Sequence, residues 1–148
     1  MITQKINLLL ADDDTDDCDF FEDALRDIPI VTTLTTIHNG VDLMNLLTQK
    51  AFKLPHALYL DLNMPLKNGF ECLSEIKSNN TLKQLPVVVF STSLDKDVVK
   101  SLYLQGANYY IRKPAEFSNL KNIILKSISL IVENQTRQAT IDEFVISN

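Results

Sequence analysis

Short apolar segments recur along the chain and predict five strands. The three at Lys5–Ala11, His56–Asp61 and Pro86–Ser91 are almost continuous apolar runs, which is typical of strands covered on both faces. The segment Val31–Ile37 is rich in threonine and alternates, so it indicates an edge strand, and Asn108–Arg112 is the fifth.

Between and after these strands, apolar residues recur at helical spacing and predict five helices. The stripes are Cys18, Phe21, Leu25 and Ile28; Leu43, Met44 and Leu47; Phe70, Leu73 and Ile76; Val98, Val99, Leu102 and Tyr103; and Phe117, Leu120, Ile124, Ile128 and Ile131. Alternating strands and helices predict an α/β fold, a doubly wound parallel sheet with helices on both faces. In the strand order 2-1-3-4-5, ligands bind beyond the carboxyl ends of strands 1 and 3.

Length and charge narrow the class of protein. The chain has 148 residues, enough for one domain, which we place at residues 5–131, followed by a tail at 132–148. A net charge of -5 without a basic stripe argues against nucleic-acid binding. No apolar run is long enough for a membrane span and no signal peptide is evident, so a cytoplasmic protein is expected.

Two features outside the strand ends also give expectations. The two cysteines, Cys18 and Cys72, have no metal-ligand spacing and are interpreted as reduced, structural residues.

The tail begins with polar residues but ends with four apolar side chains that can bury surface on the domain near the last helix, or on a neighbouring molecule. These are Ile141, Phe144, Val145 and Ile146.

Carboxylates follow two of the buried strands. Asp12 and Asp13 come directly after the first strand, and Asp61 ends the third. Gathered at one edge of the sheet, these groups would raise each other's pKa unless a cation lies between them, and hard oxygen ligands suit Mg²⁺. The alternative is that Asp12 and Asp13 only cap the first helix, but one cap needs only one side chain.

The fourth and fifth strands supply the remaining groups. The fourth ends in the hydroxyl of Ser91, and the fifth ends in Lys113, just before Pro114. A carboxylate nucleophile, a divalent cation, a hydroxyl and an ammonium group form a set suited to phosphoryl transfer, because the positive groups neutralise charge on the transferring oxygens. A lysine that must point into the site just before a proline also predicts a cis peptide between Lys113 and Pro114.

With these residues in place, the chain resembles the receiver domain of two-component response regulators over about residues 5–131. The matching stretches are Leu9-Leu10-Ala11-Asp12-Asp13-Asp14, Leu60-Asp61-Leu62-Asn63-Met64-Pro65, Asn68-Gly69-Phe70-Glu71, Leu85-Pro86-Val87-Val88-Val89-Phe90-Ser91 and Gly106-Ala107-Asn108-Tyr109-Tyr110-Ile111-Arg112-Lys113-Pro114. This resemblance implies a flavodoxin-like, CheY-like fold with a five-stranded sheet in the order 2-1-3-4-5 and five helices.

The resemblance also implies a role for each residue of the site. Asp61 is the phosphoacceptor, and Lys113 and Ser91 assist it. Mg²⁺ is held by Asp12, Asp13, Asp61 and the backbone carbonyl of Asn63. Ser91 and Tyr110 are the switch residues. The sequence departs from the family pattern where serine replaces the commoner threonine and where Thr92 replaces a smaller residue.

Other polar residues near the site have plainer interpretations. Helix capping and a solvated first turn account for the further aspartates of the first helix, which are Asp14, Asp16, Asp17 and Asp19. His38 and His56 lie at the ends of predicted strands far apart in the sequence, and no metal role is expected for them.

The expected function is a stand-alone response regulator, a phosphoprotein of a two-component system and not an enzyme beyond its own phosphorylation and dephosphorylation. Its partners would be a sensor histidine kinase or phosphotransfer protein and an unknown downstream protein, with a homodimer as a further option. Phosphorylation would change the conformation of the face formed by the fourth helix, the fifth strand and the fifth helix, to which the downstream protein binds. An aspartate-nucleophile phosphatase would need Asp-x-Asp-x-Thr, whereas the threonine here, Thr15, comes one place early. A degenerate receiver acting as a phosphate-independent binding module would be expected to have lost a site residue, and a DNA-binding regulator lacks both the charge and a second domain.

Overall fold

The computed structural model describes residues 2–134 and 137–147 and has a parallel sheet at its centre. The strands are β1 (Ile6–Ala11), β2 (Thr32–Ile37), β3 (Ala57–Leu60), β4 (Val87–Ser91), β5 (Tyr109–Arg112) and β6 (Val145–Ile146). The helices are α1 (Thr15–Arg26), α2 (Gly40–Leu47), α3 (Gly69–Ser78), α4 (Lys96–Leu104), α5 (Phe117–Asn134) and α6 (Ile141–Phe144).

The strand order is β2-β1-β3-β4-β5-β6, and every neighbouring pair is parallel. The predicted α/β architecture and the order of its first five strands are therefore confirmed, with β2 at one edge. The prediction of five strands and five helices is wrong, because the tail adds α6 and β6 within the described residues.

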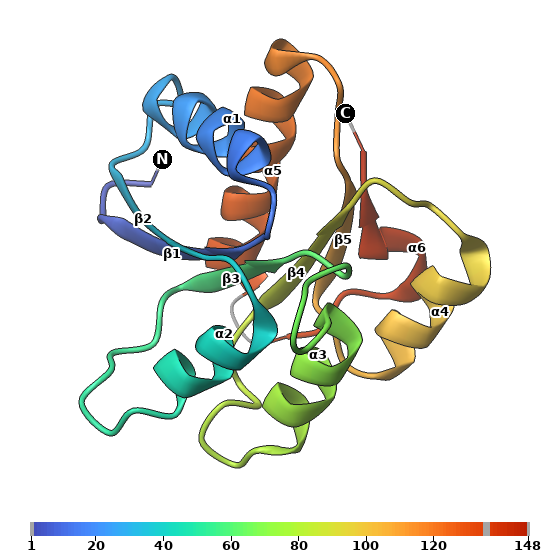
Figure 1. The fold of residues 1–148 in the computed structure, drawn as a ribbon. Coiled ribbons are helices and arrows are strands. Elements are labelled where there is room, and N and C mark those ends of the chain that lie inside the picture. Colours follow the sequence, from blue (N-terminus) through green and yellow to red (C-terminus); the bar gives the residue numbers. More distant parts are fainter. Residues whose placement is uncertain (1, 135–136, 148) are drawn as a thin grey trace.

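Helices cover both faces of the sheet, as Figure 1 shows, with α1 and α5 on one side and α2, α3 and α4 on the other. Successive side chains of a strand point to opposite faces, so β1 sends Leu8 and Leu10 toward α1 and α5 and Leu9 toward α2 and α3. The buried stripes of the helices supply the rest of both cores. None of the helices in the described ranges is long and apolar enough to cross a membrane.

The tail crosses beside α4 and joins the far edge of the sheet (Figure 1), where β6 pairs with β5. Phe144 is completely buried and packs edge-on against Tyr103 of α4, with ring centroids 5.2 Å apart, and Ile146 is 4% exposed. Ile141 remains 52% exposed. The expectation that apolar tail residues pack on the domain is therefore confirmed for Phe144 and Ile146, and in part for Val145, which is half-buried, whereas Ile141 stays largely in solvent. The expected place near the last helix fits Ile146, but Phe144 packs against α4 and β5 instead.

Candidate functional site

Parallel pairing of β1 and β3 brings the predicted carboxylates together. Ala11 pairs with Leu60, so the residues that follow, Asp12 and Asp61, emerge side by side at the carboxyl edge of the sheet. Single carboxylate oxygens of Asp12, Asp13 and Asp61 all lie within 4.8 Å of one another. Asp12 is fully buried and Asp61 is 6% exposed, while Asp13 faces solvent.

The cap of α1 is a different aspartate. Asp14 is the N-cap residue, and its side chain accepts hydrogen bonds from the backbone N–H groups of Asp16 and Asp17. A carboxylate at this position stabilises the helix start. The capping role that could have explained Asp12 and Asp13 is therefore filled by Asp14, as predicted for that residue.

The environment of Asp61 opposes its ionisation. Burial raises the pKa of this carboxyl group from 3.8 to about 6, and the nearby Asp12 adds to the shift. Lys113 and a hydrogen bond from the backbone of Asn63 act in the opposite direction but do not cancel it. Like charges held close together in a partly dry site repel each other, and a cation would relieve this repulsion.

Lys113 is the cation that the chain itself supplies. Its Nζ donates to Asp12 Oδ2 at 2.8 Å and to Asp17 Oδ2 at 2.9 Å, and it lies 3.6 Å from Asp61 Oδ2. Burial disfavours the charge on Lys113, but the hydrogen bonds to Asp12 and Asp17 outweigh it and raise the lysine pKa above its ordinary value. Lys113 is therefore held as a charged ammonium group beside the candidate nucleophile.

The prediction of a cis peptide at Lys113-Pro114 is wrong, because none of the peptide bonds in the described ranges is cis. The backbone N–H of Lys113 donates to the carbonyl of Ser91 at 2.8 Å, which extends the β4–β5 ladder by one residue. With the backbone fixed in this way, the four-carbon side chain of lysine reaches the carboxylates without a tighter turn.

Ser91 and Tyr110 lie on neighbouring strands and are joined through Ser93. Ser91 is buried at the end of β4, and its Oγ accepts a hydrogen bond from the backbone N–H of Ser93 at 3.3 Å. The carbonyl of Ser93 accepts a hydrogen bond from the hydroxyl of Tyr110, whose side chain is completely buried. The loop after β4 thus connects the predicted hydroxyl residue to the predicted switch aromatic.

Two neighbours of Asp61 shape its position. Asn63 lies in the loop after β3 and is exposed, and its backbone hydrogen bond to the Asp61 carboxylate is the contact noted above. Gly69 opens α3 against this loop, and a Cβ atom there would lie 2.3 Å from the carbonyl oxygen of Asp61. This close approach explains why no side chain fits at Gly69.

Asp17 is the residue whose place the sequence interpretation missed. The sequence interpretation groups it with Asp14, Asp16 and Asp19 in a solvated first turn, yet its carboxylate forms an ion pair with Lys113. One signal was available. Asp17 precedes the buried Phe21 by four residues, and residues four apart share a helix face. His38 also reaches the site, with its Nδ1 atom 3.0 Å from the carbonyl oxygen of Asp12.

The donor set fits a hard divalent cation. Asp12, Asp13 and Asp61 offer only carboxylate oxygens, which such cations prefer, and one or two carboxylates with several waters satisfy Mg²⁺. With Asp17 included, four carboxylates lie in or beside the cluster and three of them, Asp12, Asp17 and Asp61, face the one ammonium group of Lys113, which leaves an excess of negative charge. Both cysteines are buried outside this carboxylate cluster, and burial raises the pKa of Cys18 to about 12 and that of Cys72 to about 11.

Comparison with known proteins gives consistent similarities. Residues 8–125 match the family described as response regulator receiver domain. The response regulator Rcp1 from Synechocystis sp. (strain ATCC 27184 / PCC 6803 / Kazusa) is 32% identical over 136 residues, covering 89% of this chain and 92% of that protein. The structure of its Mn(2+)-bound form superposes with a TM-score of 0.74 at 29% identity, covering 91% of this chain and 99% of that one. The structure of the phosphorylated cyanobacterial phytochrome response regulator RcpA superposes with a TM-score of 0.76 at 33% identity, covering 93% of this chain and 98% of that one.

Proposed function

Because the chain belongs to the response regulator receiver domain family, we propose that it accepts a phosphoryl group on Asp61 from a phosphohistidine. The donor would be a sensor histidine kinase or a phosphotransfer protein. The observation that carries this proposal is the placement of Asp61 at the end of β3, within 4.8 Å of Asp12 and Asp13 and 3.6 Å from the ammonium of Lys113.

The transfer follows from what each side chain can do. A carboxylate oxygen of Asp61 forms a bond to phosphorus while the bond from phosphorus to the donor nitrogen breaks, and the nitrogen retains that electron pair. Lys113 and Ser91 donate hydrogen bonds to the phosphoryl oxygens, where negative charge is concentrated. Asp12, Asp13, Asp61 and the carbonyl of Asn63 would hold Mg²⁺, which supplies further charge neutralisation when bound. A Mn(2+)-bound form of the similar Rcp1 supports a divalent cation here.

The same site would reverse the signal by hydrolysis of the aspartyl phosphate. Asp61 is restored, and the chain acts on no other substrate, so we propose a switch and not an enzyme. The alternative function is that of an enzyme, an aspartate-nucleophile phosphatase. Such an enzyme would release phosphate from an added phosphorylated substrate, whereas a receiver would not. A degenerate, phosphate-independent receiver is a weaker alternative, because Asp61, Lys113 and the acidic pair are all present and close together.

The route from Asp61 to a partner surface runs through Ser91, Ser93 and Tyr110. When the Ser91 side chain moves toward a phosphoryl oxygen to donate to it, its Oγ draws away from the N–H of Ser93 and the hydrogen bond between them lengthens. The carbonyl of Ser93 then shifts, together with the hydroxyl of Tyr110 that it accepts from. Tyr110 packs on Phe144 with ring centroids 6.3 Å apart, so the movement reaches the tail.

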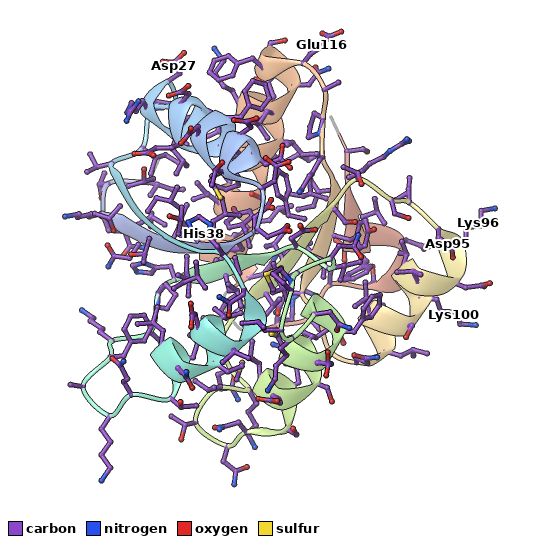
Figure 2. The ribbon with its side chains drawn as sticks, viewed as in Figure 1. Asp27, His38, Asp95, Lys96, Lys100 and Glu116 are labelled. Atoms are coloured by element: carbon purple, nitrogen blue, oxygen red, sulfur yellow. The ribbon has the colours of Figure 1, made fainter. Side chains whose placement is uncertain are left out.

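The predicted responding face is formed by α4, β5 and α5; because β6 pairs with the outer edge of β5, we place the responding surface between α4 and the tail. It includes an apolar cavity of about 590 Å³, with Lys96 and Lys100 on its α4 side. Figure 2 shows both lysines projecting away from the body of the molecule. The cavity is lined by Leu94, Lys96, Val99, Lys100, Tyr103, Leu104, Ile141 and Val145. A downstream protein that binds this surface more tightly in one state would shift the population toward that state.

Mass spectrometry of the intact protein after incubation with acetyl phosphate tests the proposal. One phosphoryl group is expected in the presence of Mg²⁺, and none with EDTA or in Asp61→Asn. Ser91→Ala should still be phosphorylated but should show a smaller change in the environment of Tyr110, measured by NMR. A wild-type chain that gains no phosphoryl group, or an Asp61→Asn chain that gains one at the wild-type rate, would overturn the assignment.

A further inference from the structure

Lys113 is held on two sides by carboxylates of different kinds. Asp12 Oδ2, at 2.8 Å, belongs to the carboxylate cluster that fits a cation, and is completely buried. Asp17 Oδ2, at 2.9 Å, lies outside that cluster on the first turn of α1, with its side chain 38% exposed. The ammonium group lies between them, and only 10% of the Lys113 side chain is exposed.

A cation at the site changes this arrangement. The cation would neutralise part of the negative charge of Asp12, so this carboxylate would attract Lys113 less. The cation itself would also repel the ammonium group. Lysine carries its charge on a flexible four-carbon stem, so an ammonium group that loses its partners moves toward water. Asp17 is then the carboxylate that remains to oppose this movement.

We propose that Asp17 is a positioning residue that keeps the ammonium group of Lys113 aimed at Asp61 while a divalent cation occupies the carboxylate cluster. At 3.6 Å from Asp61 Oδ2, the ammonium group already lies beyond hydrogen-bond distance of the nucleophile. A phosphoryl group on Asp61 would bring further acceptor oxygens next to the ammonium group. Lys113 can therefore donate to the phosphoryl group with one proton and to Asp17 with another, because an ammonium group has three donors.

Whether Asp17→Asn raises or lowers the phosphorylation rate distinguishes a positioning role from a simple effect of charge. The phosphoryl donor is an anion, so removal of a nearby negative charge should by itself help the donor approach and speed the reaction. Loss of a positioning carboxylate should instead slow it. A slower Asp17→Asn variant therefore cannot be explained by the change in charge alone.

The chain offers a matched control. Asp16 precedes Asp17 in the same first turn of α1, is exposed, and makes no ion pair among the described residues. Asp16→Asn removes the same charge from the same helix turn, so it reproduces the effect on the helix dipole and on the net charge. Asp17→Glu keeps the carboxylate and tests whether the charge can reach Lys113 from a longer side chain.

The experiment measures the phosphorylation rate with acetyl phosphate and the affinity for beryllofluoride, both with saturating Mg²⁺. Asp17→Asn is expected to lower both by about fivefold, the size expected from loss of one partly exposed ion pair. Asp16→Asn should equal or exceed the wild type, and Asp17→Glu should recover at least half of the lost rate. Equal or faster reaction of Asp17→Asn, or no recovery in Asp17→Glu, would overturn the inference.

The inference rests on the proposed phosphorylation of Asp61, but the two fail in different ways. If the wild type takes up neither phosphoryl group nor beryllofluoride, the proposed function is wrong. If the wild type reacts and Asp17→Asn matches Asp16→Asn, the function stands and only the role of Asp17 is wrong.

Discussion

Ionisation of the buried carboxyl group of Asp61 destabilises the folded protein, and the nearby Lys113 offsets this destabilisation only in part. The carboxyl pKa of Asp61, about 6 in the folded chain, lies above the value of about 3.9 expected when unfolded. The folded state therefore binds the proton more tightly, and the stability of the metal-free protein falls as pH rises from about 4 to about 6. The stability lost over this window is about 2–3 kcal/mol.

Asp61→Asn should therefore stabilise the protein in EDTA. At pH 7.5 the free energy of unfolding is expected to rise by about 2 kcal/mol, because the amide has no charge to bury. Near pH 4 the difference from the wild type should be small, since both chains are then largely uncharged at this position. Urea denaturation at the two pH values measures this, and an equal gain at both would show that repulsion at Asp61 is not the cause.

Gly69 fixes the approach of α3 to the site. Gly69→Ala places a Cβ atom 2.3 Å from the carbonyl of Asp61, so the loop after β3 must move. We expect the free energy of unfolding to fall by about 1–3 kcal/mol and the affinity for Mg²⁺ to weaken.

Gly106→Ala is the control, because its φ of 100° is also unfavourable for alanine but its nearest neighbour is Lys77 at 3.4 Å. Gly106→Ala should lose stability while keeping the Mg²⁺ response, measured by calorimetric titration. If both variants keep that response, the clash does not reach the site.

At the scale of elements, periodicity identified every strand and helix of the receiver fold, because each buries an apolar face that appears as a stripe or run. It could not identify α6 and β6. Val145–Ile146 is too short for a periodic signal, and its pairing depends on the open edge of β5, a long-range feature. Asp17 was missed for a similar reason, since its partner Lys113 lies 96 residues away. The carboxylate cluster was predictable because strand ends meet at one edge.

The tail should contribute to stability through Phe144. Phe144→Ala removes a completely buried ring from its contacts with Tyr103 and Tyr110 and is expected to cost about 3–5 kcal/mol. Ile141→Ala, on the same short helix but 52% exposed, should cost no more than about 0.5 kcal/mol. Chemical denaturation of the two variants compares them. Equal, small losses would mean that the tail does not pack on the domain in solution.

At the scale of the whole molecule, the sheet brings three carboxylates together at one edge, whereas apolar side chains fill its two faces. The protein carries a net charge of -5, and part of that charge lies in the cluster of Asp12, Asp13 and Asp61, where β1 and β3 end. Because those two strands are central in the sheet, a ligand that relieves repulsion between their ends stabilises the entire fold.

Mg²⁺ should therefore raise the unfolding temperature of the intact chain. At about ten times its dissociation constant it adds about 1.4 kcal/mol, or about 3–5 °C for a chain of this size. Asp13→Asn should lose most of the increase, whereas Asp16→Asn, with the same change in charge, should keep it. The increase should also shrink below pH 6, where Asp61, with its pKa of about 6, holds a proton that the cation must displace. Differential scanning calorimetry at pH 5 and pH 8 measures both effects. An increase that survives in Asp13→Asn or does not change with pH would place the cation elsewhere on the molecule.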